Sequence, residues 1–289
     1  MTRRTSARST GTAMVRALLS LSCAIGPACL PAAAQWLHYP TRGVPRTPEG
    51  KPDLRAPAPR TENGRPDFSG IWITASNVPC QPNVRTRFGD CSIELPISPQ
   101  AFDIGASVPG GLPYQPWAAA LAKRRTEDLS KEDPHAQCLP MNVPRGYGLP
   151  HLHKIIQVPG LLVTLNEFNA EYRQIFLDGR PLPVDPVPSW NGYSSGTWDG
   201  DTLVVKTSGF RDGLWLDTHG DPLTDAATIT ERLRRPSFGL LEVAITIDDP
   251  KAYTRPWTVT MNQEIKLDVE LIDEICMENN KAIQHLVGK

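Results

Sequence analysis

The sequence has no extended stripe of basic residues and no excess of positive charge. It contains 30 Lys and Arg residues against 31 Asp and Glu residues, a formal net charge of −1. Proteins that bind nucleic acid usually carry a basic patch, so we expect no nucleic-acid partner. The chain also has no P-loop, no Rossmann glycine fingerprint and no haem-attachment motif. We therefore expect no nucleotide or redox cofactor.

The chain has no apolar run long enough to span a membrane. Residues 1–34 combine four arginines and no acidic residue with an interrupted apolar run over Ala17–Leu30 and a small-residue site at Ala32–Ala34. This is the pattern of a secretory signal peptide cleaved after Ala34, because the apolar run is too short for a transmembrane helix. We predict export to the periplasm or the medium, with no stable membrane anchor.

Cysteine is scarce: the chain has six, and four follow the predicted cleavage site. These are Cys80, Cys91, Cys138 and Cys276. An even number in an exported chain indicates disulfides. Three pairings are open, and we favour Cys80–Cys91, which closes a short loop, with Cys138–Cys276, which ties the segment before the barrel to its last strand. A metal–thiolate site is the alternative, although the C-x-x-C spacing is missing.

About 255 residues remain after cleavage, enough for one large all-β domain. Residues 35–66 form a proline-rich leader that we expect to be extended or disordered. The leader holds a duplication, Arg46–Leu54 and Arg60–Phe68, of which only the second copy runs into a strand. Residues 67–289 form the barrel domain, and 76–150 is an insertion with one helix near 115–130. We expect a monomer or a homodimer.

From residue 153 onward, short strands and turn residues alternate as in an antiparallel meander. The expected strands are 153–158, 161–167, 173–178, 193–198, 202–207, 226–235, 240–248, 257–265 and 269–276. Asp199-Gly200 is a hairpin turn. Matching Val163 with Leu177 and Leu165 with Ile175 places Glu167 opposite Arg173. Such a pair stabilises a sheet modestly, or orients a substrate carboxylate or carbonyl.

The first strand opens with Asp67-Phe68-Ser69-Gly70-Ile71-Trp72. This Gly-x-Trp opening resembles that of lipocalin-like, calycin-type β-barrels. The resemblance implies that Trp72 plugs one end of the barrel, that Gly70 allows a close backbone approach, and that the barrel encloses one small molecule.

Further motifs extend the comparison over most of the domain. They are Arg173–Arg180, Trp198–Val205, Thr230–Arg232 with Arg235, and Tyr253–Trp257. With the Pro66–Trp72 opening, this set resembles an uncharacterised family of secreted bacterial proteins, which has no established mechanism. The chain departs from the family after Gly220-x-Pro222, where similar sequences tend to place a histidine.

Glu231 is the strongest candidate for chemistry. It alternates with Ile229, Leu233 and Arg235 along one strand, so a face that buries these apolar residues also buries the carboxyl group. Burial raises a carboxyl pKa and suits a general acid or base, with Arg173 or Arg232 stabilising negative charge. The alternative is an ion pair between Glu231 and an arginine that holds the strand register, and Arg173 is the first candidate partner.

For the other candidate residues, a purely structural interpretation stands beside the functional one. His151-Leu152-His153 has the spacing of a metal site if Asp217 or His219 supplied a third ligand, but lone H-x-H patterns are common and we expect no metal. The loop 210–225 is rich in Asp, Trp and His residues and suits either ligand contact or plain solvation. The substrate-binding candidates are Glu167, Tyr193, Trp198, Asp217, His219 and Trp257.

Gly192-Tyr193-Ser194-Ser195-Gly196 matches the serine-hydrolase pattern G-x-S-x-G, but a hairpin follows it where that chemistry requires a helix. Two functions therefore stay open. The first is a cofactor-free acid/base enzyme of lyase, isomerase or hydrolase type that binds a partly apolar small molecule inside the barrel. The second is a binding or carrier barrel without catalysis, in which Glu231 is buried in a complete ion pair.

Overall fold

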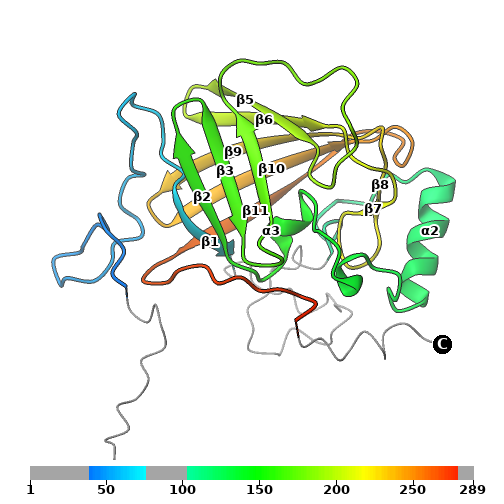
Figure 1. Ribbon diagram of the computed structural model, residues 1–289, viewed down its shortest axis with the longest axis horizontal. Helices are drawn as coiled ribbons and strands as arrows, with labels where there is room; N and C mark the ends of the chain where they lie inside the picture. Colours follow the sequence, from blue (N-terminus) through cyan, green and yellow to red (C-terminus); the bar gives the residue numbers. More distant parts are fainter. Residues whose placement is uncertain (1–38, 76–102, 279–289) are drawn as a thin grey trace, which may run out of the picture. The chain divides into compact units, whose positions relative to one another are not determined.

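The computed structural model describes residues 39–75 and 103–278. Within them, a closed nine-strand barrel has the order β1-β11-β10-β9-β6-β5-β4-β3-β2 (Figure 1). The strands are β1 Gly70–Thr74, β2 His153–Val158, β3 Leu161–Asn166, β4 Tyr172–Phe176, β5 Tyr193–Asp199, β6 Thr202–Ser208, β9 Thr228–Ser237, β10 Leu240–Asp248 and β11 Trp257–Lys266. A separate two-stranded sheet joins β7 Leu214–Trp215 to β8 Pro222–Leu223. The predicted all-β barrel is confirmed.

One pair of neighbouring barrel strands departs from the predicted antiparallel order. β4 and β5 run parallel and share only two paired positions, Ile175 with Ser194 and Phe176 with Ser195. Parallel neighbours need a long return connection, which is supplied here by residues 177–192. The antiparallel prediction is therefore wrong for this pair. The short ladder leaves the earlier residues of β4 without backbone partners on β5.

Most predicted strands lie within a few residues of the observed ones, because their alternation of apolar and polar residues is strong. β10 has the predicted bounds, and Gly200 adopts a φ of +59° in the β5–β6 hairpin turn, as the Asp-Gly signal requires. The strand predicted at 269–276 is wrong: this segment is irregular apart from one bridge, between Phe168 and Glu274. The small β7–β8 hairpin was not predicted.

The predicted register of the β3–β4 hairpin is wrong by three residues. Thr164 lies opposite Arg173, and Leu162 opposite Ile175. Leu162 and Ile175 are both fully buried, so this register places two apolar side chains of neighbouring strands in the core. An odd shift exchanges the two faces of a strand pair. Glu167 consequently lies in the loop after β3, while Arg173 points into the barrel.

Apolar side chains from every barrel strand fill much of the interior. Trp72 is fully buried, donates its indole N–H to the Phe68 carbonyl at 3.0 Å, and lies under the Arg235 guanidinium. Gly70 has a φ of +149°, and a Cβ there would lie 3.3 Å from Cδ1 of Ile265. The glycine therefore makes room for side chains rather than for a second backbone.

Segments outside the barrel pack against it. The helix α2, Pro116–Glu127, confirms the predicted helix and buries Ala118 and Ala122, while Trp117 is largely exposed. A 3-10 turn at His135–Gln137 and the short helix α3, Arg145–Gly148, precede β2. No helix among the described residues is long and apolar enough to cross a membrane.

The leader is more ordered than its composition suggests. Both copies of the duplication close the same turn: Arg46 pairs with Pro52 and Arg60 with Pro66 in isolated bridges. In each copy the arginine donates to the carbonyl oxygen of the residue four positions later, at 3.2 and 2.7 Å. A backbone hydrogen bond from Phe238 to Ala56 ties the linker between the copies to the barrel. The first copy is thus a structural repeat of the second.

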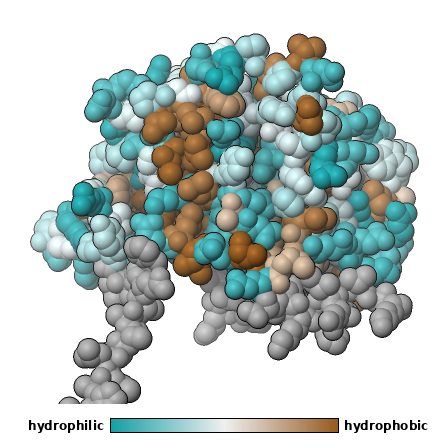
Figure 2. Space-filling model, viewed as in Figure 1, coloured by the Kyte–Doolittle hydropathy of each residue, from teal (hydrophilic) through white to brown (hydrophobic). Residues whose placement is uncertain are grey.

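An apolar strip covers the outer face of β2 and β3, where Figure 2 shows a column of brown side chains. Ile156 lies opposite Val163 and Val158 opposite Leu161, and Leu165 extends the strip along β3. This strip explains the register error, because Val163 and Leu165 look like core residues in the sequence.

The disulfide Cys138–Cys276 is present, with Cα atoms 5.3 Å apart and a sequence separation of 138 residues. It ties the segment before β2 to the chain after β11, next to the small buried cluster Met141, Leu149 and Phe168. Cys80 and Cys91 lie outside the described residues.

Replacing both cysteines, Cys138→Ser with Cys276→Ser, is expected to lower the free energy of unfolding by about 2–5 kcal/mol, because the bridge closes a long loop. Urea unfolding with and without reductant measures this. The reduced wild-type protein should match the reduced double variant, and equal stability of the wild-type protein and the double variant without reductant would contradict the expectation.

Candidate functional site

A buried ion pair lies among polar side chains inside the barrel. Glu231, on β9, is fully buried between Ile229 and Leu233, as its alternation predicted. Arg173, on β4, is 4% exposed and binds both carboxylate oxygens of Glu231: Nη1 donates to Oε1 at 3.0 Å and Nη2 donates to Oε2. The first candidate partner of Glu231 is therefore the one observed.

Neighbouring hydroxyl groups complete the coordination of this pair. The Arg173 Nε donates to Ser194 at 3.1 Å and Nη2 donates to Thr207 at 2.8 Å. The Tyr147 hydroxyl donates to Oε1 of Glu231 at 3.0 Å. Burial alone would lower the pKa of Arg173, but the Glu231 carboxylate outweighs it and raises that pKa. The Arg173 guanidinium therefore stays charged and forms an ion pair with Glu231. Ser194 points into this network from the start of β5, and a hairpin rather than a helix follows it, so it has no nucleophile elbow.

Tyr147 reaches Glu231 because α3 crosses the barrel mouth. Its backbone carbonyl accepts hydrogen bonds from Thr74 and from Gln263 on the barrel wall. At the start of the helix, Arg145 forms a buried two-point ion pair with Asp133, at 2.7 and 2.6 Å. These contacts hold α3 as a fixed cover. Burial, and secondarily the Glu231 carboxylate, raise the pKa of the Tyr147 hydroxyl, which therefore stays protonated as a donor.

A small cavity of about 30 Å³ lies between α3 and the strands, with Tyr147, His153, Thr164 and Arg173 in its wall. Two buried polar atoms at this cavity, Nε2 of His153 and Oδ1 of Asn142, have no hydrogen-bond partner among the described residues. Burial lowers the pKa of His153 to about 4, so its imidazole is neutral at physiological pH. The cavity has room for a water molecule or for the polar tip of a ligand.

A wider cleft of about 570 Å³ adjoins the small cavity. Glu171, Arg173 and Asn191 line both spaces. The remaining walls come from β4, from the loop before it and from the end of the 177–192 connection; they include Tyr172, Gln174, Phe176, Trp190 and Tyr193. The cleft lies where β4 and β5 do not pair, so the short parallel ladder creates this opening in the barrel wall.

Glu171 is the titratable carboxyl group that lines both spaces. It is partly buried, and its Oε1 accepts a hydrogen bond from the Met141 backbone N–H at 2.8 Å. Burial raises its pKa to about 7, against the lowering effect of that hydrogen bond. The carboxyl group therefore changes charge near neutral pH. It lies in the same lining as the Arg173 guanidinium, whose charge Glu231 already compensates.

Several predicted site residues lie away from the cleft. Arg232 is on the outer barrel face in an exposed ion pair with Asp199, so it does not reach Glu231. Glu167 accepts backbone hydrogen bonds from Leu152 and Ile272 and holds its loop to the chain after β11. Of the residues proposed for catalysis or binding, Arg173 and Tyr193 line the cleft, and Glu231 lies directly behind Arg173.

Two predicted aromatic residues have packing roles. Trp198 stacks on Phe68 with ring centroids 5.6 Å apart, and Trp257 is buried edge-on against Tyr253. The histidines of His151-Leu152-His153 also separate: His151 contacts Glu274 at 3.0 Å, whereas His153 lines the small cavity.

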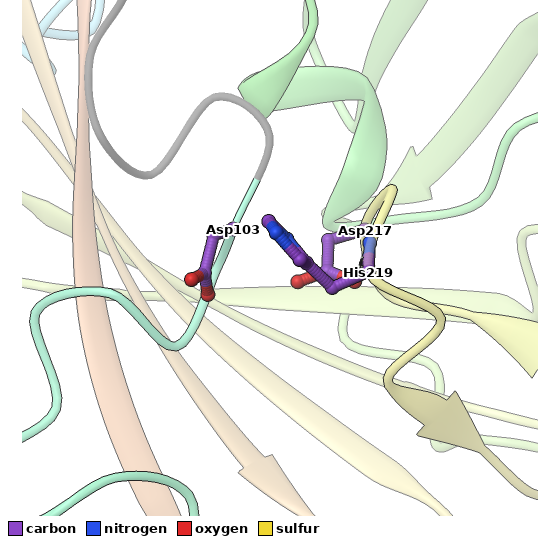
Figure 3. A group of neighbouring side chains, drawn as sticks. All are labelled: Asp103, Asp217 and His219. Atoms are coloured by element: carbon purple, nitrogen blue, oxygen red, sulfur yellow. Dashed lines mark hydrogen bonds between the residues drawn. The ribbon is translucent and has the colours of Figure 1, made fainter. Parts of the chain in front are cut away.

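Asp217 and His219 meet a third residue, Asp103. Their ligand-type atoms all lie within 4.8 Å of one another, and Figure 3 shows the three side chains converging. Burial, and then the Asp217 carboxylate, raise the pKa of Asp103 and also that of the neighbouring Asp221. In the part of the chain described here, the histidines of the H-x-H motif belong to no such group.

Sequence reasoning missed Glu171, Asn142, Tyr147 and the role of His153. Glu171 lies in a loop whose length depended on the wrong register, and α3 is too short for a periodicity signal. Comparison with family models, curated proteins and solved structures finds no match.

Because the folded-state pKa of Glu171 is raised from 4.5 to about 7, its protonated form favours the folded state. This contribution to stability is present below pH 4.5 and is lost as the pH rises through 7. The variant Glu171→Gln lacks this titration. As the pH rises from 4.5 to 7.5, its melting temperature should therefore increase relative to that of the wild-type protein.

Thermal unfolding at several pH values measures this difference. Glu242→Gln is the matched control, because its carboxylate is in an ion pair with the exposed Arg234 on the outer face. A wild-type minus Glu171→Gln difference that stays constant with pH would rule out the perturbed carboxyl group.

Proposed function

We propose that this protein is an exported binding barrel that takes a neutral, partly aromatic small molecule into the cleft beside β4. The observation that carries the proposal is a pair of buried atoms, Nε2 of His153 and Oδ1 of Asn142, for which the described part of the chain supplies no hydrogen-bond partner. They lie in the small cavity that adjoins the cleft. Buried polar atoms are rarely left without a hydrogen bond, so a ligand tip or bound water completes them. Like a lipocalin, the barrel takes up one small molecule, although the body of the ligand lies in the cleft in the wall and not in the barrel interior.

The charges around the cleft support a neutral ligand. Arg173 is compensated by Glu231, and His153 is uncharged. The remaining charged group in the lining is Glu171, which is partly protonated near neutrality and disfavours an anion when ionised. A carboxylate group at the inner end of the cleft would have to give up its hydration without gaining an uncompensated cation, which is costly, because the Arg211 guanidinium lies on the Trp190 ring and is not part of the lining.

The walls of the cleft suit an aromatic or flat apolar body. Phe176, Trp190 and Tyr193 line it together with amide and hydroxyl groups. The Arg180 and Arg211 guanidinium groups lie 3.9 Å and 4.6 Å from the centroids of Phe176 and Trp190, which limits the motion of both rings. The volume of about 570 Å³ lies in the range of ordinary small-molecule sites.

The burial of Glu231 favours binding over the acid/base mechanism first considered for it. A general acid or base must reach the substrate directly or through one water molecule. Glu231 is fully buried, and its hydrogen-bond partners among the described residues are the donors Arg173 and Tyr147. A proton on Glu231 has no route to a ligand in the cleft without breaking this network.

Export remains part of the proposal. It rests on the signal-peptide pattern of residues 1–34 and is supported by the disulfide Cys138–Cys276, since disulfides persist in oxidising compartments.

Benzamide and benzoate form a matched pair of probes, because they share a ring and differ in charge. We expect benzamide to bind at least about 5-fold more tightly, since a desolvated carboxylate without a cation costs 1–3 kcal/mol or more. Chemical-shift titration of the labelled protein at pH 7.5 measures both dissociation constants and locates the perturbed residues.

Trp190→Ala and Phe176→Ala should weaken benzamide binding, whereas Val184→Ala, at a fully exposed position outside the cleft lining, is the control. Tighter binding of benzoate, or benzamide binding that both cleft variants leave unchanged, would refute the proposal.

A further inference from the structure

The turn between β7 and β8 is held by Asp217, which folds back on its own backbone. Its Oδ1 accepts hydrogen bonds from the N–H groups of His219, Gly220 and Asp221, at 2.9, 3.1 and 3.2 Å. Its Oδ2 accepts one from the Ile104 N–H at 3.0 Å. Asp217 thus joins the turn to the segment that carries Asp103. It holds the backbone from which the Asp103 and His219 side chains project.

The helix α2 braces this turn from outside. Thr126 donates to the His219 carbonyl at 3.0 Å, and Arg125 donates to the Gly220 carbonyl at 2.8 Å. The Arg125 guanidinium then stacks on Trp215, 4.4 Å from the ring centroid. The turn is consequently positioned by contacts to its backbone.

Three side chains converge at this braced turn. One ligand-type atom each from Asp103, Asp217 and His219 lies within 4.8 Å of the others, and Figure 3 shows the imidazole ring between the two carboxylates. Around one zinc ion such atoms lie about 2.0–2.2 Å from the metal, hence roughly 3.4 Å from each other. A modest rotation of Asp103 and His219 closes that difference, because Asp217 is already held by the backbone.

The local charge balance favours a cation here. Asp103, Asp217 and the buried Asp221 lie together, and within the described ranges no ion pair joins any of the three to a Lys or Arg side chain. Asp221 is instead bound by the Tyr114 hydroxyl. Clustered buried carboxylates are costly unless a cation or a metal compensates them.

We propose that Asp103, Asp217 and His219 form a binding site for one divalent transition-metal ion, with zinc as the representative. An imidazole nitrogen suits zinc, copper or nickel, whereas magnesium and calcium prefer sites made only of oxygen atoms. Water completes the coordination shell. The ion neutralises the carboxylates and ties the Asp103 segment to the β7–β8 turn. This site is separate from the cleft and does not depend on the proposed ligand.

The test is calorimetric titration of zinc chloride into the purified protein, stripped with EDTA and carrying no histidine tag. We expect one ion to bind per chain and saturating zinc to raise the melting temperature, because an ion that binds only the folded state stabilises it. Asp103→Asn and His219→Gln should each weaken zinc binding by at least about 10-fold, since even supporting residues of metal sites contribute that much.

His151→Gln and Asp225→Asn are the matched controls and should bind zinc within about two-fold of the wild-type protein. His151 belongs to a separate cluster with Glu274, and Asp225 is paired with Lys251. Melting curves of the stripped variants establish that each is folded. Absence of zinc binding, unchanged affinity in both ligand variants, or tighter binding of calcium than of zinc would each overturn the proposal.

Discussion

The ion pair of Glu231 and Arg173 is the interaction on which the rest of the barrel's interior depends. Its two charged groups come from strands on different parts of the wall, and they are almost completely withdrawn from water. Such a pair gains little free energy over an apolar replacement, but removing one partner leaves a buried charge that costs about 3–5 kcal/mol. Ser194, Thr207 and Tyr147 satisfy the remaining hydrogen-bonding capacity. The pair therefore fixes which way β4 faces and how α3 covers the mouth.

The same pair determines what the adjoining cleft can accept. β4 and β5 pair at only two positions, so the wall opens beside Arg173, which reaches both the small cavity and the cleft. An arginine at this place would select anions if it were alone, but Glu231 cancels its charge from inside the barrel. Neutral hydrogen-bonding groups on His153 and Asn142 then dominate the inner end. The Asp103–Asp217–His219 cluster lies on another element, the braced β7–β8 turn, and its chemistry is independent of the cleft.

The parts of the structure that follow from local patterns could be predicted from the sequence. Alternation along β9 placed Glu231 inside with Ile229 and Leu233. Pro116 indicated where α2 begins, and Asp199-Gly200 indicated the turn between β5 and β6. The β3–β4 register could not be predicted, because Val163 and Leu165 are as apolar as Leu162 and Ile175, and only the closed barrel decides which pair is buried. Glu171 and α3 depended on that register and on contacts distant in sequence. Asp103 joins Asp217 and His219 across more than a hundred residues, which no spacing rule detects.

The most direct test of the account is the ratio of benzamide to benzoate dissociation constants in Glu231→Gln, measured on a variant whose melting curve shows that it is folded. Glutamine keeps an oxygen acceptor for Arg173 and Tyr147 but removes the compensating charge. The account predicts that the ratio shifts toward benzoate by at least about 10-fold, because a hydrogen bond to an uncompensated charge contributes about 1.5–3 kcal/mol. An unchanged ratio in the folded variant would contradict the claim that this buried pair makes the cleft selective for neutral ligands.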